Sequence, residues 1–208
     1  MKNHQYIERP TREAMRELPK FEGLPLERIC LVRSKDDLIF AHEQISKFSH
    51  VGFDTESKPV FVANQPKTGP HLLQVSTQYN AFLFLPNHTT SNELLSEIIQ
   101  SENIVKVGFG LKSDRGLIYK KLGFKLRSTL DLSVIVRRLG YRQKVGLQAA
   151  VAIVLEQYLQ KSKSLTTSNW ARNPLTARQK LYAANDAYAS FQVYMKLTEV
   201  AKHLLVTA

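Results

Sequence analysis

Residues 51–57 read VGFDTES, an apolar run that leads into two carboxylates. The β-branched and aromatic residues before the carboxylates predict a strand. Asp54 and Glu56 are two positions apart, so the pleat of a strand directs both side chains to the same face. Two close carboxylates on a buried strand are costly unless cations neutralise them. The stretch therefore predicts either a divalent-metal site or two carboxylates that each bind an arginine, and we favour the metal.

Outward from this strand, the sequence alternates between short apolar runs and helical spacing. Two of the runs follow directly, separated by Pro, Gly and Asn, and predict strands that pair mostly antiparallel. Helices are expected where apolar residues recur every three to four positions between caps such as Thr90 and Gly123. The expected strands cover 29–32, 51–56, 72–77, 81–85 and 104–109, and the expected helices cover 38–48, 90–100, 111–122, 132–139, 147–159 and 177–205. This order predicts a mixed α/β fold.

The first 28 residues differ from the rest of the chain. They contain Pro10, Pro19 and Pro25, with only a short helical possibility over 11–18. This composition predicts an N-terminal arm that packs on the domain or on a partner. For a chain of 208 residues, one domain over 29–208 preceded by this arm is a better fit than two complete domains.

Basic residues are concentrated in the second half of the chain. The formal net charge is +11, and residues 106–208 contain 18 basic and only 5 acidic side chains. A surface that serves solubility usually mixes both signs, so we favour phosphate-backbone binding over a solvated basic face. The candidate nucleic-acid contacts are Lys112, Arg115, Arg142, Lys144, Lys161, Lys163 and Trp170.

Several classes of protein are disfavoured. The longest apolar stretch, 149–155, is far shorter than the ~20 residues that cross a bilayer, and the polar beginning of the chain lacks the apolar segment of a secretory signal. Cys30 is the single cysteine, which excludes an intramolecular disulfide and a zinc site built from several thiolates. We expect an intracellular protein, cytoplasmic if bacterial, without a membrane partner.

Two more acidic residues occupy positions comparable to those of the first pair. Asp114 follows the strand expected over 104–109, and Asp186 lies on the expected last helix. Tyr182 precedes Asp186 by four residues, which is about one helical turn, so the phenol and the carboxylate share a face. Taken alone, Tyr182 and Asp186 are either a hydrogen-bonded surface pair or part of a site. Together with Asp54 and Glu56 they complete a pattern.

That pattern resembles the DEDDy subgroup of the DnaQ-like 3′–5′ exonucleases, which includes Werner-type domains and ribonuclease D. The resemblance rests on three motifs in the expected order, FDTE, VGFGLKSD and YAAND, which contain Asp54 and Glu56, Asp114, and Tyr182 with Asp186. It extends over residues 168–188, SNWARNPLTARQKLYAANDAY. One departure is Gly110, where many members have Asn, and this favours the Werner-like branch.

The resemblance implies a ribonuclease H-like mixed central sheet flanked by helices, and a two-metal mechanism that uses Mg²⁺ or Mn²⁺. Oxygen-only ligands suit these hard cations better than zinc. In this arrangement Asp54 would bridge both ions, Glu56 and Asp186 would complete the first, and Asp114 would hold the second. Tyr182 would orient the attacking water, because a phenol with a pKa near 10 is a poor base at neutral pH.

The implied reaction is hydrolysis of phosphodiester bonds from the 3′ end, with release of nucleoside 5′-monophosphates. Single-stranded or recessed-end DNA is the favoured substrate, and RNA or very short oligonucleotides are alternatives. A competing hypothesis is a catalytically silent nucleic-acid-binding module. Another assigns the basic half to a protein partner or to oligomer assembly, with the arm exchanged between subunits.

Three other residues have less specific roles. His50 is expected at a strand end as a solvent-facing or hydrogen-bonded side chain, and Asp131 as a helix N-cap. Trp170 is expected either to stack on a base or to pack under the last helix.

Overall fold

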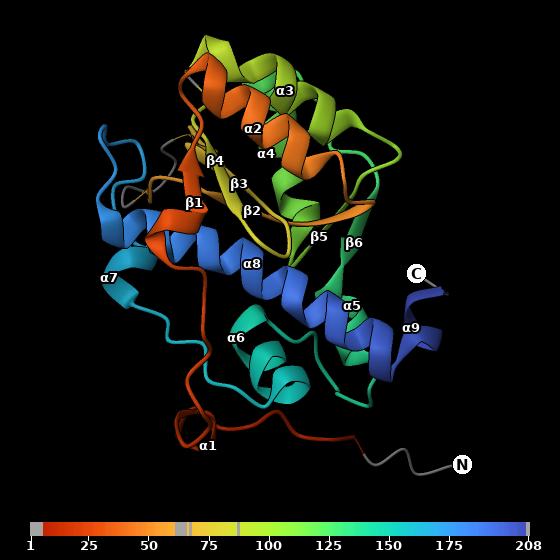
Figure 1. The fold of residues 1–208 in the computed structure, drawn as a ribbon. Helices are drawn as coiled ribbons and strands as arrows, with labels where there is room; N and C mark the ends of the chain where they lie inside the picture. Colours follow the sequence, from red (N-terminus) through yellow and green to blue (C-terminus); the bar gives the residue numbers. More distant parts are fainter. Residues whose placement is uncertain (1–5, 61–65, 67, 87, 207–208) are drawn as a thin grey trace.

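A mixed sheet of six strands forms the centre of the described part of the chain, which in this computed structural model comprises residues 6–60, 66, 68–86 and 88–206 (Figure 1). The strands are β1 (Ile29–Leu31), β2 (His50–Glu56), β3 (Leu72–Ser76), β4 (Ala81–Phe84), β5 (Val105–Gly108) and β6 (Thr129–Asp131), in the spatial order β1-β4-β3-β2-β5-β6. β2, β3 and β4 pair antiparallel, as predicted, and the other pairs are parallel. The α/β architecture expected from the sequence is confirmed.

Helices cover both faces of this sheet (Figure 1). One face packs on α2 (Lys35–Ile45), α3 (Thr89–Gln100) and α4 (Leu111–Leu122), and the other on α8 (Ala177–Val200), α5 (Leu132–Arg137) and α6 (Leu147–Ala150). Successive residues of β2 face opposite sides of the sheet, so the strand contacts both helical layers. The buried Phe53 side chain belongs to the core beneath α2, α3 and α4, whereas the neighbouring Gly52 faces α8.

The close approach of α8 to β2 depends on Gly52. A Cβ atom at this position would lie 2.0 Å from the backbone oxygen of Ala187 and 3.0 Å from Cβ of Phe191. Only glycine lets the helix backbone come this near to the strand. The contact brings the middle of α8 against the end of β2 at which Asp54 lies.

The expected helix over 111–122 matches α4, and the expected start of the last helix also matches. Gly110 precedes α4 with φ +73°, a left-handed conformation that Gly and Asn adopt most readily. Gly and Asn are therefore both suitable at position 110, where this chain has Gly and many members of the family it resembles have Asn. The side chains of Thr176 and Gln179 form the predicted capping box at the start of α8.

Other predicted helices differ from the structure. The helix predicted over 147–159 is wrong in extent: α6 passes into a π-helical turn, η2 (Val151–Leu155), which ends at Glu156 with φ +55°. The last helix stops at Val200, and Ala201 separates it from α9 (Lys202–Val206). β6 and α7 (Lys163–Thr166) were not predicted, because segments of three or four residues are too short to show a period. Within the described residues, no helix is long and apolar enough to cross a membrane.

The N-terminal arm lies along the domain and contains α1 (Arg12–Arg16) and a short 3₁₀ turn, η1 (Leu26–Arg28). Thr11 caps α1 within the stretch for which a short helix was expected. The arm is held by isolated bridges from Ile7 to Tyr141 and from Lys20 to Tyr158. Three of its apolar side chains are buried, namely Met15, Phe21 and Leu24.

Candidate active site

Three of the predicted carboxylates converge where β2 meets α8. Asp54 and Glu56 extend from the same face of β2, and Asp186 extends from α8, which Gly52 allows to come close. One carboxylate oxygen from each residue lies within 4.8 Å of the other two. We call Asp54, Glu56 and Asp186 the acidic cluster. The side chain of Asp186 is buried, and the other two are half-buried.

The fourth predicted carboxylate, Asp114, lies near this cluster but does not belong to it. Asp114 is in the first turn of α4, and its Oδ1 accepts a 2.7 Å hydrogen bond from the Thr55 hydroxyl. The Thr55 backbone N–H donates a 2.9 Å hydrogen bond to Oδ1 of Asp54. Thr55 thus connects Asp114 on one side of β2 to Asp54 on the other.

Tyr182 lies one turn before Asp186 on α8, and its hydroxyl lies near that carboxylate and two further polar groups. Thr166 Oγ1 is 2.9 Å from the phenol oxygen, and Lys161 Nζ lies 3.5 Å from it. Trp170 packs against the phenol ring at a centroid distance of 5.9 Å. These contacts hold the hydroxyl at the edge of the acidic cluster.

Lys161, expected from the sequence to be either a phosphate contact or a solvated charge, lies beside the acidic cluster. Its ammonium donates a hydrogen bond to Asp186 and lies 5.0 Å from the centre of the Tyr182 ring. Burial alone would lower the pKa of Lys161, but the adjacent Asp186 and Tyr182 outweigh burial and raise it. The side chain therefore remains a cation and offsets part of the negative charge of the cluster.

Burial raises the pKa of every carboxyl group at the site, and repulsion from neighbouring carboxylates of the cluster adds to this for Asp54 and Glu56. Burial, followed by the charge of Asp186, raises the pKa of Asp54 to about 7, and burial together with Asp54 raises that of Glu56 to about 9. Burial also raises the pKa of Asp114 and of Asp186. The single ammonium of Lys161 does not cancel these effects. Such a cluster favours a divalent cation, and its oxygen-only donors suit Mg²⁺ or Mn²⁺.

Three other predicted residues are placed by the structure in the fold itself. His50 stacks on Tyr194 with ring centroids 4.7 Å apart, in keeping with the expected strand-end role. Asp131 caps α5 by accepting a 3.0 Å hydrogen bond from the Ser133 N–H, as predicted. Trp170 is fully buried, so the prediction that it stacks on a base is contradicted and the packing alternative holds.

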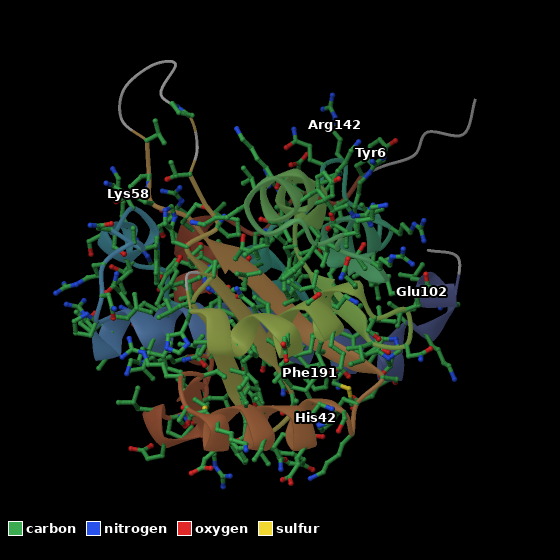
Figure 2. All side chains as sticks on the ribbon, turned by 90° about the horizontal axis from the view of Figure 1, so that it is seen from above. Tyr6, His42, Lys58, Glu102, Arg142 and Phe191 are labelled. Atoms are coloured by element: carbon green, nitrogen blue, oxygen red, sulfur yellow. The ribbon has the colours of Figure 1, made fainter. Side chains whose placement is uncertain are left out.

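The remaining predicted nucleic-acid contacts are exposed and lie outside the acidic cluster. Arg115 donates a hydrogen bond to Thr129, and Figure 2 shows Arg142 directed away from the molecule, next to Tyr6. The other predicted contacts that are exposed are Lys112, Lys144 and Lys163. Their roles as phosphate contacts stay predictions.

The sequence reasoning missed Thr55, Thr166 and Gln74. Gln74 on β3 pairs directly with Asp54 on β2, and its side chain is fully buried with no hydrogen-bond partner for either amide atom among the described residues. Buried amides are normally paired, so this one points to a further polar group at the site. A single glutamine inside the apolar run LLQVS was a detectable signal.

Comparison with known proteins identifies the family. A sequence model described as 3′–5′ exonuclease matches residues 30–202, which is most of the chain. The chain belongs to the 3′–5′ exonuclease family. The mouse bifunctional 3′–5′ exonuclease/ATP-dependent helicase WRN is 31% identical over 149 residues, which cover 71% of this chain and 11% of that protein. The chain thus spans only a small part of this relative.

Two solved structures share the fold. The Nibbler EXO domain of Aedes aegypti superposes with a TM-score of 0.69 at 22% identity, covering 87% of this chain and 92% of that one. Escherichia coli RNase D, an exoribonuclease, gives a TM-score of 0.69 at 21% identity, with 83% and 45% covered. These likenesses confirm the expected ribonuclease H-like architecture.

Proposed function

We propose that this chain is a divalent-metal-dependent 3′–5′ exonuclease that hydrolyses the terminal phosphodiester bond of a nucleic-acid strand and releases a nucleoside 5′-monophosphate. One observation carries the proposal: Asp54, Glu56 and Asp186 place carboxylate oxygens within 4.8 Å of one another, next to Tyr182 and Asp114. This constellation lies in the region that matches the exonuclease family.

The carboxylates would hold two ions, either Mg²⁺ or Mn²⁺. In our assignment Asp54 would help to hold both ions, Glu56 and Asp186 would help to hold one, and Asp114 would help to hold the other. Divalent cations supply charge stabilisation to the attacking and the leaving oxygen of an in-line displacement. The hydrogen bond from Thr55 orients Asp114 for this role.

Tyr182 would orient the attacking water. Burial and the adjacent Asp186 raise the pKa of its phenol, so the hydroxyl keeps its proton at neutral pH. A protonated hydroxyl can donate a hydrogen bond but is a poor general base. Thr166, 2.9 Å away, restricts the direction of that hydroxyl.

The favoured substrate is DNA with a single-stranded or recessed 3′ end. The Werner-like motifs of the sequence support DNA, whereas the fold is shared with an exoribonuclease. RNA or very short oligonucleotides are therefore the alternative substrates. The high positive charge of the chain is compatible with either nucleic acid.

The test is degradation of 5′-labelled DNA and RNA of matched sequence, with Mg²⁺, Mn²⁺ or EDTA. We expect a ladder of progressively shorter labelled products with either metal and none with EDTA. Asp54→Asn should abolish the ladder. Binding of the strand without cleavage under all conditions would contradict the proposal and support the silent-module hypothesis.

A further inference from the structure

A groove adjoins the acidic cluster between the N-terminal arm and the segment that contains Lys161. Its volume is about 390 Å³, within the range of about 300–1,000 Å³ that holds ligands of small-molecule size. We call it the arm groove. Its lining residues are Arg12, Met15, Arg16, Gln148, Tyr158, Lys161, Lys163, Thr166 and Thr167.

The arm groove is strongly basic. Four of its lining residues are Lys or Arg, and none is Asp or Glu. Arg12 and Arg16 are four residues apart on α1, so both side chains lie on one face of the helix. Arg12, Arg16 and Lys163 are exposed and have no hydrogen-bonded or ionic side-chain partner among the described residues. Their charges are therefore available to a ligand.

The arm groove reaches the acidic cluster through two of its own residues. Lys161 lines the groove and also donates to Asp186. Thr166 lines the groove, and its hydroxyl is 2.9 Å from the phenol oxygen of Tyr182. A strand with its terminal phosphodiester at the acidic cluster thus has a basic path next to it.

The arm that carries the two arginines is fixed in place. The Phe21 N–H donates a 2.9 Å hydrogen bond to the Tyr158 carbonyl, and the Tyr158 N–H donates a 2.7 Å bond to that of Pro19. Met15, between the two arginines, is 94% buried, with a relative exposure of 6%. The family match begins at residue 30, so the arm lies outside it.

We propose that the arm groove binds the phosphodiester backbone of the substrate strand, at the nucleotides that precede the one being released, and that Arg12 and Arg16 each contact a phosphate. Guanidinium groups suit this role because their planar donors match phosphate oxygens. This inference rests on the proposed function for the polarity of the strand. Binding of single-stranded nucleic acid in the groove can be measured without cleavage.

The binding test uses fluorescence anisotropy of a labelled 12-nucleotide single-stranded DNA in EDTA, over 50–200 mM NaCl. The slope of log affinity against log salt is negative, and each lost phosphate contact on a single strand reduces its magnitude by about 0.7, so R12Q/R16Q should reduce the magnitude by about 1.4. The affinity advantage of the wild type over this variant should accordingly shrink by about sevenfold across that salt range. R12K/R16K, which keeps the charge, should retain the wild-type slope.

A matched control is K35Q/K47Q, which removes the same charge near the two ends of α2, on the opposite face of the sheet. We expect its salt slope to stay close to the wild-type value. If R12Q/R16Q reduces the magnitude of the slope no more than K35Q/K47Q does, the proposal is overturned, because any loss would then reflect net charge alone.

A kinetic test separates this proposal from the proposed function. On the 12-nucleotide substrate R12Q/R16Q should raise KM and leave kcat unchanged, and on a dinucleotide, which has no upstream phosphate, it should match the wild type. Equal losses on both substrates would indicate a general structural defect and contradict the groove assignment. If the wild type cleaves nothing but the difference in slope persists, the exonuclease function fails while the groove stands.

Discussion

Gly52→Ala tests whether the contact between β2 and α8 sets the geometry of the acidic cluster. The added Cβ would lie 2.0 Å from the backbone oxygen of Ala187, the residue that follows Asp186. Real Cβ contacts essentially never fall below 3.0 Å, so strand and helix must separate by about 1 Å. A backbone carbonyl cannot rotate away as a side chain would, and the helix itself must move.

The expected magnitude follows from that displacement. Overpacking of this kind costs about 1–3 kcal/mol, which for a protein of this size lowers Tm by roughly 2–4 °C per kcal/mol. Mg²⁺ demands ligand distances of about 2.0–2.1 Å, so a 1 Å shift of Asp186 should disrupt the site. A misplacement of this size can reduce catalytic rates by about 10²-fold. We therefore expect activity to fall much further than stability.

The assay compares thermal melting with the rate of cleavage of a 5′-labelled single strand in Mg²⁺. Gly116→Ala is the matched control, because Gly116 lies inside α4 and a Cβ there meets nothing within 4 Å. That substitution should stabilise the protein by about 0.5–1 kcal/mol and leave cleavage unchanged. A Gly52→Ala protein with wild-type cleavage and Tm would refute the reasoning.

The other predictions concern charge and packing. Tyr182→Phe should leave measurable cleavage, whereas Asp186→Ala should leave none, and equal residual rates in the same assay would contradict the roles assigned here. Without metal, the free energy of unfolding should fall as pH rises from about 4 toward 9. The unfolded chain ionises its carboxyl groups near pH 4. The folded protein holds the pKa of Asp54 at about 7 and that of Glu56 at about 9, so it binds more protons than the unfolded chain over this range. Mg²⁺ should reverse this trend in urea titrations, and a metal-free stability independent of pH would disprove it. Trp170→Ala should lower stability by about 3–5 kcal/mol, because Trp170 is fully buried, and a change below 1 kcal/mol in the same titrations would show that the site tolerates the cavity.

Local signals in the sequence predicted those parts of the fold whose stabilising contacts are themselves local. α4 begins after Gly110 and ends at Gly123, both with positive φ, and such a pair of glycines is visible without any tertiary structure. The helix expected over 147–159 failed for the opposite reason. Its apolar residues continue, but the chain turns at Glu156, and Tyr158 pairs with Lys20 of the arm, a contact that lies 138 positions away along the sequence.

In the acidic cluster, too, local sequence signals predicted some features and long-range contacts determine others. The strand period relates Asp54 to Glu56, and the helical turn relates Tyr182 to Asp186, so each pair could be predicted separately. The position of Lys161 could not, because its contact with Asp186 depends on how a loop 25 residues earlier folds back over α8. The sequence offered it equally as a phosphate contact or a solvated charge. In the structure it borders both the acidic cluster and the arm groove, so the same ammonium that offsets the carboxylates also begins the basic path we assign to the substrate strand.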